Sequence, residues 1–388
     1  MAGEHEYPRF SDAEFARRQA AVRERLAAAE LDALVVHGRG GRGGSQLQYL
    51  TNWPAMTEAY LLFPRSGEPA LWVHHDDHLP LAQRASLFPN ARGTNAAAAA
   101  TLAAALRERG LAGARLGLAG PLRFRPYERL QALLPDARWT SFNQEFDALF
   151  LVKSDEELAW LRRAAALGDR ALVALEREVC PGLTEHDLAA IVQGTYRWET
   201  GHSIVSFTSM QPMRESAVPA PTPYPVHRRL QRGDLLTAEV HAEYWGYRGQ
   251  SLRPYAIGEE PPADYQRLYE VAEAAFHAVA AALRTGAAPA DVVAAADLIE
   301  DAGYTIHDDL VHGIGNGYLP PVLRTRGASP EPPPADFRYP ENSTWVIQPN
   351  VITRDGRMAV NLGDMVRVTA RGAERLSSYP LRLTVCGQ

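Results

Sequence analysis

The feature that most constrains this chain is the start of a long helix near its middle. Residues 154–157 form a capping box, in which the hydroxyl of Ser154 and the carboxylate of Glu157 satisfy backbone amides that are free at a helix start. Helical periodicity then continues to about Val179, where a Cys-Pro-Gly sequence ends it. Because the pattern of the chain changes at this helix, we expect a second domain to begin with it.

The parts before and after this helix start have different patterns. Before it, an amphipathic helix at 12–29 and an alanine-rich helix at 95–110 alternate with apolar strands at 33–36, 60–63, 70–73 and 115–118. After it, strands at 204–209, 235–242, 344–347 and 365–369 are mixed with helices at 264–283 and 290–302. The first pattern is typical of an α/β domain and the second of an α+β domain. We predict that these domains cover residues 1–151 and 152–388.

Composition excludes several classes of protein. The formal net charge of −6 argues against non-specific binding of nucleic acid, which needs a basic surface. No apolar run is long enough to span a membrane, and the N-terminus lacks the basic and apolar segments of a signal peptide. The two cysteines, Cys180 and Cys386, suggest no disulfide framework. We therefore expect a cytoplasmic protein with no nucleic-acid or membrane partner.

Five short segments of the second domain carry the polar residues that matter most for function. They cover residues 233–239, 246–253, 311–315, 346–349 and 362–369. In this order and spacing they resemble the pita-bread family of creatinase, prolidase and aminopeptidase P. Segments 31–36 and 49–51 resemble the creatinase-type N-terminal domain of that family. The resemblance covers nearly the whole chain. It implies an α/β N-terminal domain followed by an α+β pita-bread C-terminal domain, a small-molecule substrate and a homodimer.

Peptidases of this family hold two divalent metal ions with two aspartates, one histidine and two glutamates. Carried over residue by residue, the five ligand positions hold Glu239, Gln250, His312, Gln348 and Gly363. Two divalent cations need several anionic oxygens, but glutamine is neutral and glycine has no side chain. We therefore predict no metal and no other cofactor. Two alternatives stay open: Asp364 or Asn361 shifts into the last position, or a single metal binds Glu239, His312 and a glutamine oxygen.

The resemblance to creatinase, which acts without a metal, implies a function for such a site. We predict a metal-independent hydrolase or lyase that acts on a small amide-, amidine- or urea-type C–N bond. His312 would be the general acid or base, because a histidine titrates near neutral pH, and Glu239 would orient it. The residues expected to bind the substrate are Gln250, Gln348, Arg253, Tyr318 and Tyr247.

Other functions stay open beside this one. A catalytically inactive pita-bread protein would use the same site to bind a small ligand or a partner protein. An Xaa-Pro metallopeptidase is a third possibility, which the loss of carboxylates disfavours. In this family the N-terminal domain of one subunit often borders the site of its partner. Arg39 or Arg42, in the glycine-rich segment 38–44, would then complete the site in trans.

Overall fold

The computed structural model describes residues 7–40, 45–94, 97–200, 206–216, 224–329 and 331–387. The chain divides into two compact units, Met1–Phe150 and Leu151–Gln388. Within the described ranges, no helix combines the length and the apolar character that a membrane crossing requires.

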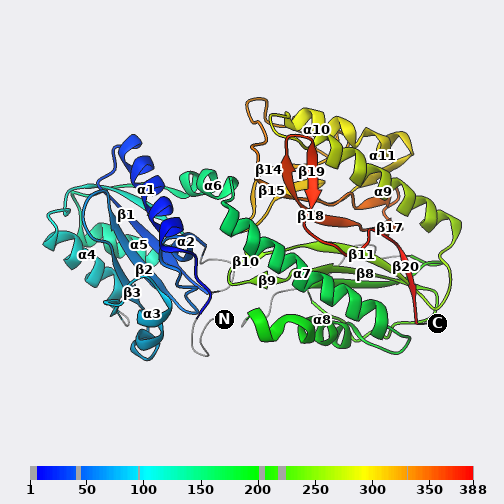
Figure 1. Ribbon diagram of the computed structural model, residues 1–388, viewed down its shortest axis with the longest axis horizontal. Coiled ribbons are helices and arrows are strands. Elements are labelled where there is room, and N and C mark those ends of the chain that lie inside the picture. Colours follow the sequence, from blue (N-terminus) through cyan, green and yellow to red (C-terminus); the bar gives the residue numbers. More distant parts are fainter. Residues whose placement is uncertain are drawn as a thin grey trace. The chain divides into compact units, whose positions relative to one another are not determined.

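The first unit is built around a six-stranded sheet with the order β4-β3-β2-β1-β5-β6 (Figure 1). Its strands are β1 Ala33–Gly38, β2 Ala59–Pro64, β3 Ala70–Val73, β4 Arg92–Gly93, β5 Arg115–Ala119 and β6 Arg138–Ser141. Its helices are α1 Asp12–Ala28, α2 Ser45–Thr51, α3 Leu79–Ala85, α4 Ala98–Glu108, α5 Phe124–Leu133 and α6 Asn143–Leu151. Strand β2 is antiparallel to both neighbours, and the other neighbouring pairs are parallel. The predicted α/β pattern is confirmed, and each of the four expected strands lies within an observed one.

The second unit contains a large, mostly antiparallel sheet with the order β14-β13-β15-β18-β11-β8-β7, to which β19 and β20 are added beside β18 and β11. Its strands are β7 Phe207–Pro212, β8 Asp234–Val240, β11 Ser251–Ile257, β13 Val311–Gly313, β14 Leu319–Leu323, β15 Thr344–Ile347, β18 Gly363–Thr369, β19 Gly372–Arg375 and β20 Thr384–Cys386. Two smaller sheets comprise β9 Glu243–Tyr244, β10 Tyr247–Arg248, β12 Tyr304–Ile306, β16 Val351–Thr353 and β17 Ala359–Val360. The predicted α+β pattern is confirmed.

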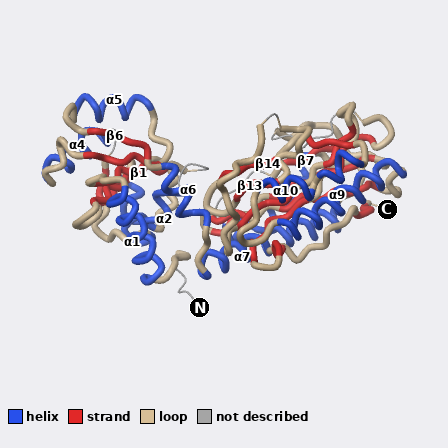
Figure 2. Tube along the Cα trace, turned by 90° about the horizontal axis from the view of Figure 1, so that it is seen from above, coloured by secondary structure: helices blue, strands red, loops and turns tan. Residues whose placement is uncertain are grey.

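The helices of the second unit cover the large sheet. They are α7 Asp155–Glu178, α8 Glu185–Thr200, α9 Ala263–Ala282, α10 Pro289–Ala295 and α11 Asp297–Asp301. The capping box that predicts α7 is present, with Ser154 Oγ accepting from Glu157 N at 3.2 Å and Glu157 Oε2 accepting from Ser154 N at 2.9 Å. Figure 2 shows the strands of this sheet lying along the long helices α7 and α9.

The side chains of β8 point alternately to the two faces of the large sheet. Leu236, Ala238 and Val240 belong to the apolar core that α7 and α8 form with the sheet. Successive side chains of a strand point to opposite faces. Thr237 and Glu239 therefore point to the other face, which we call the ligand face because it carries Glu239.

Candidate functional site

Four of the five ligand positions lie side by side on the ligand face. Glu239 pairs with Leu252 of β11, and Leu252 pairs with Gly363 of β18. Opposed residues of antiparallel strands share a face, and Gln250 shares it as well because it is two residues from Leu252. Gln348 follows the last residue of β15, and a Cβ atom added to Gly363 would lie 2.9 Å from its Cβ. The order of the segments in the sequence therefore predicted a real spatial cluster.

Two glutamine amides connect the acidic groups of this cluster. Gln250 Nε2 donates to Glu239 Oε1 at 3.0 Å and to Gln348 Oε1 at 2.9 Å. Gln348 Nε2 in turn donates to Asp308 Oδ2 at 3.3 Å. A primary amide has two N–H donors, so both hydrogens of Gln250 are used between these two ligand positions. Two uncharged amides thus lie between the carboxylates of Glu239 and Asp308 and donate to both.

Glu239 has a basic neighbour that was not among the predicted residues. His241 Nε2 lies 2.6 Å from Glu239 Oε1, and the side chains are 14% and 12% exposed. The ring of Phe207, opposite Glu239 on β7, meets the His241 ring edge-on at 5.4 Å. The spacing of two residues along an extended segment was the sequence signal for this contact, since such residues share a face.

His312, on β13, makes different contacts from those predicted. Its ring is stacked on that of Tyr318, with centroids 4.4 Å apart and planes at 22°. Its Nδ1 lies 3.3 Å from the carbonyl oxygen of Gly313. Burial lowers the pKa of His312 below its usual value, so the ring is neutral at pH 7. Tyr318 donates its hydroxyl hydrogen to Asp309, which also accepts from Arg324 Nε at 3.3 Å.

The residues of the ligand face do not fit a two-metal centre. Of the five ligand positions, only Glu239 supplies a carboxylate, and no group of three His, Cys, Asp or Glu side chains in the described ranges is arranged to hold a metal ion. Gly363 cannot regain a side chain without movement, because an added Cβ would lie 2.6 Å from the carbonyl oxygen of Ile347. Asp364 does not replace it, because Asp364 pairs with Arg253 on the opposite face of the sheet. No step of the chemistry is therefore assigned to metal ions.

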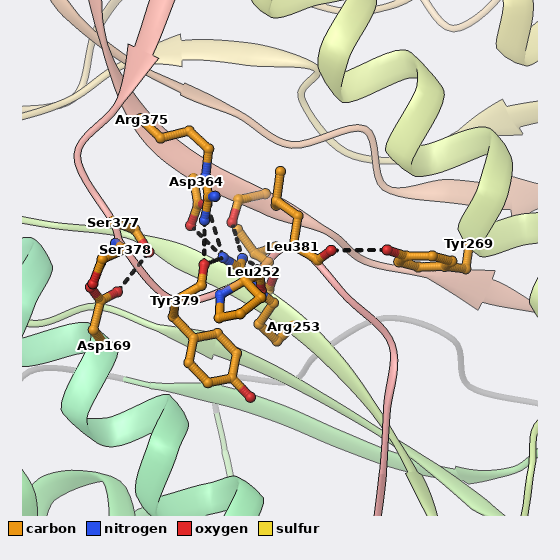
Figure 3. A network of polar contacts seen from close by, with 12 residues as sticks. Asp169, Leu252, Arg253, Tyr269, Asp364, Arg375, Ser377, Ser378, Tyr379 and Leu381 are labelled. Carbon is orange, nitrogen blue, oxygen red and sulfur yellow. Dashed lines mark hydrogen bonds and ion pairs between the residues drawn. The ribbon is translucent and has the colours of Figure 1, made fainter.

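Arg253 and Tyr247 lie away from the ligand face. Arg253 is fully buried and donates through Nη2 to both oxygens of Asp364, at 3.0 and 2.9 Å, within the network of Figure 3. It follows Leu252, whose side chain is on the ligand face, so its own side chain points to the opposite one. The Tyr247 hydroxyl donates to Glu157 Oε1 at 2.8 Å. The structure thus does not bring these two predicted substrate-binding residues to the site, because both are occupied by structural partners.

The proposed trans residues receive no structural assignment. Arg39 is exposed just after β1 in the first unit, and Arg42 lies outside the described residues. The expected strand at 204–209 is observed as β7 from Phe207, and residues 201–205 are also outside the described ranges.

Comparison with known proteins gives two family matches. The model of metallopeptidase family M24 matches residues 159–370, and the model of the creatinase/prolidase N-terminal domain matches residues 18–152. A probable dipeptidase PepE of Mycobacterium tuberculosis is 30% identical over 246 residues, which is 61% of this chain and 61% of the relative. The match therefore spans about three fifths of that relative's length. An Xaa-Pro dipeptidase of Pyrococcus furiosus is 25% identical over 269 residues, 68% of this chain and 73% of the relative.

Solved structures show the same architecture over nearly the whole chain. The dipeptidase PepE of Mycobacterium ulcerans superimposes with a TM-score of 0.79 and 27% identity, covering 98% of this chain and 100% of that one. The prolidase of Pyrococcus horikoshii has a TM-score of 0.80 at 18% identity, covering 95% and 99%. The predicted fold, an α/β domain followed by a pita-bread domain, is confirmed.

These comparisons correct the predicted activity. A metal-independent, creatinase-like enzyme for amide, amidine or urea C–N bonds was expected from the lost carboxylates. The similar proteins are instead named dipeptidases and Xaa-Pro dipeptidases. The prediction was wrong because the loss of metal ligands says what the site cannot hold, and not which relatives the rest of the chain resembles.

Proposed function

This chain belongs to metallopeptidase family M24, and from that premise we propose that its ligand face binds short peptides without a two-metal centre. Short peptides are the substrate class implied by the names of its relatives, a dipeptidase and an Xaa-Pro dipeptidase. The second unit, with its glutamine-linked site, would keep the recognition of a peptide and lose the hydrolysis that depends on metal ions.

The observation that supports this proposal most is the position of the Gln250 amide. It uses both its hydrogens to join Glu239 to Gln348, two of the family's ligand positions. Metal ions at that place would face amide hydrogens, which repel a cation, and a single carboxylate. The same amides suit a peptide, because they can exchange their hydrogen bonds for those of a peptide carbonyl or amide.

The site also lacks a substitute for the metal ions in hydrolysis. Peptide hydrolysis needs a water molecule made nucleophilic at neutral pH, which bound metal ions do by lowering its pKa. His312 is neutral but stacked under Tyr318, and no hydrogen bond joins it to Glu239 in the described ranges. The Glu239–His241 pair is partly exposed and is better placed to contact a bound ligand.

Calorimetric titration of the full chain with Ala-Pro and Ala-Ala tests the proposal. We expect binding that is the same after treatment with a chelator and after addition of Mn²⁺ or Co²⁺, with no free amino acids released. Elemental analysis of the same protein should find less than one transition-metal ion per chain. Absence of binding for every dipeptide tested would refute the proposal.

A dipeptidase is the second candidate, and the names of the relatives favour it. It predicts release of free amino acids that rises with added Mn²⁺ or Co²⁺ and stops with a chelator. The titration and the product assay thus separate the two candidates in one preparation. A homodimer and a cytoplasmic location are part of our proposal, and sedimentation of the purified chain tests the first.

A further inference from the structure

A hollow of about 700 Å³ lies in the first unit, bordered by strand β2 and by helices α4 and α5. It is at the edge of the sheet where β1, β3 and β5 end, since Glu58 just before β2 and His74 just after β3 both line it. Ligands of open α/β sheets commonly bind outside the carboxyl ends of the strands, in pockets of about 300–1,000 Å³. Both the volume and the position therefore suit a small molecule. We call this site the α4–α5 hollow.

The sheet side of the α4–α5 hollow is polar, but its negative charge is balanced within the chain. Tyr60 is 1% exposed and donates its hydroxyl hydrogen to Glu58 Oε2 at 3.2 Å. Glu58 also forms an ion pair with Arg123, whose Nε lies 3.1 Å from its Oε1. The Nδ1 atom of His74 is buried and has no hydrogen-bond partner in the described ranges. This side of the hollow therefore offers His74 to a polar ligand group and has no unpaired carboxylate that would repel an anion.

The helix side of the α4–α5 hollow is lined by small apolar residues. Ala98 and Ala99 are the first two residues of α4, and Pro126 and Ala132 belong to α5. Because these side chains are short, they leave space between the two helices for a flat organic group. An aromatic ring in this space would remove apolar surface from water and pack against the ring of Tyr60. The lining thus favours a ligand with an aromatic body.

The rim of the α4–α5 hollow carries positive charge that the chain does not neutralise. Arg125 and Arg129 both line the hollow and are exposed, and their spacing of four residues places them on the same side of α5. Neither arginine forms an ion pair in the part of the chain that the structure describes. The first turn of α5 contains no acidic residue, and Glu128 is the acid that shares the rim with them. Guanidinium groups match the oxygens of phosphate and carboxylate groups, so this rim suits an anion.

We propose that the α4–α5 hollow binds a small phosphate monoester with an aromatic body. The phosphate group pairs with Arg125 and Arg129, and the ring lies against Tyr60 between the two helices. A phosphate monoester carries up to two negative charges near neutral pH, whereas a carboxylate has one charge for the two guanidinium groups and is the weaker match. This site is separate from the proposed peptide site, because all the residues that line it belong to the first unit.

Calorimetric titration of the full chain with phenyl phosphate at pH 8 tests this assignment. We expect a dissociation constant below about 1 mM, and binding at least about tenfold weaker for benzoate and for phenol. Arg125→Gln and Arg129→Gln should each weaken the binding of phenyl phosphate by about tenfold, whereas Glu128→Gln should strengthen it about twofold by removing a like charge. Arg138→Gln is the matched control. Arg138 is exposed and begins β6, which runs parallel to β5, so it lies at the opposite edge of the same sheet.

A variant that fills the α4–α5 hollow gives a second test. Ala132 is exposed on α5 and lines the hollow, so Ala132→Trp places a ring there and should abolish the binding of phenyl phosphate without changing the unfolding midpoint. If the midpoint falls, the two arginine variants decide alone, because their side chains are exposed. The assignment is overturned if the dissociation constant exceeds about 1 mM, if benzoate binds as tightly, or if the arginine variants behave like Arg138→Gln. Failure of dipeptides to bind would refute the proposed function and leave this site standing.

Discussion

The two faces of the large sheet in the second unit differ in whether a buried carboxylate is paired with positive charge. On the face away from the site, the fully buried Asp364 is bonded to Arg253 Nη2 at 2.9 Å and to Arg375 Nε at 2.6 Å (Figure 3). On the ligand face, one residue away along β18, the chain has Gly363, and its neighbours are Gln250 and Gln348. Next to each other on β18, one face thus has a buried carboxylate, and the other has a glycine among ligand positions of which only Glu239 is acidic.

The two faces differ because a buried carboxylate needs a positive partner, and the source of that partner is not the same on each face. Burying an unpaired carboxylate is costly, whereas one that is paired and fully hydrogen-bonded is tolerated. Asp364 has its two guanidinium groups within the chain. The carboxylates of a two-metal centre depend on ions from outside, so a site that no longer binds ions is more stable with amides. The comparison therefore supports a ligand face on which the former metal-ligand positions Gln250, Gln348 and Gly363 carry no charge and Glu239 carries the one carboxylate.

The largest effect is expected from removing the negative charge of Asp364, on the face away from the site. Asp364→Asn keeps the shape of the side chain but leaves Arg253 and Arg375 facing an uncharged amide. Removing one partner of a buried pair costs about 3–5 kcal/mol, so the free energy of unfolding in urea should fall by about that amount. Asp301→Asn, at an exposed position, is the control. A loss for Asp364→Asn below about 1 kcal/mol would contradict the role assigned to the pair.

A smaller loss is expected from adding a single methyl group to the ligand face. In Gly363→Ala the new Cβ would lie 2.6 Å from the carbonyl oxygen of Ile347, which is backbone and cannot turn away. Overpacking of this kind costs about 1–3 kcal/mol in unfolding free energy. Gly194→Ala is the matched control. It lies in α8 with no atom within 4 Å of an added Cβ, and should stabilise the protein by up to about 1 kcal/mol. Equal effects of the two variants would show that Gly363 is not tightly packed.

Restoring one carboxylate to the ligand face should be unfavourable, and increasingly so as pH rises. Gln348→Glu would place a second negative charge beside Asp308, whose Oδ2 is now 3.3 Å from the Gln348 amide nitrogen. Like charges raise the pKa of the new carboxyl group in the folded state above its unfolded value. Stability should therefore fall as pH rises from 4 to 8, by about 1–2 kcal/mol. Gln348→Met should show a loss that does not depend on pH. Recovery of the Gln348→Glu loss by Mn²⁺ would show that this face still binds metal ions.

The sequence predicted the elements of the fold better than the contacts of the site. Apolar runs followed by turn residues predicted β1, β2, β3 and β5, and the capping box predicted α7, because both signals depend on neighbouring residues. The edge strands β4 and β6 were missed, since two to four partly exposed residues leave little pattern. The ligand positions were found from the order of the segments. That order identifies the strands that carry the site, but it does not show to which face of the sheet each side chain points.

The missed contacts could be found by applying strand alternation to each segment. Arg253 was taken as a substrate-binding residue, although it follows Leu252 and so points away from the face of Glu239. Glu239 was assigned to His312, 73 residues away in sequence, while its partner is His241, two residues away. The activity was beyond this reasoning, because several reactions are known on one fold and the positions that changed do not identify a substrate.

The smallest expected effect concerns His312, which the registers of β13 with β15 and of β15 with β18 also place on the ligand face. Burial lowers the pKa of His312 in the folded protein, so the unfolded chain takes up a proton there as pH falls through about 6.5 while the folded protein does not. Stability should therefore decrease below pH 6.5, with a slope of at most about 1.4 kcal/mol per pH unit from this residue. Eleven other histidines also titrate, since the chain has 12, so the measurement is the difference between wild type and His312→Gln. That difference should be flat above pH 7 and fall in favour of the variant towards pH 5.5. A difference that changes in the opposite direction would mean that His312 is charged in the folded state and paired with an acid of the ligand face.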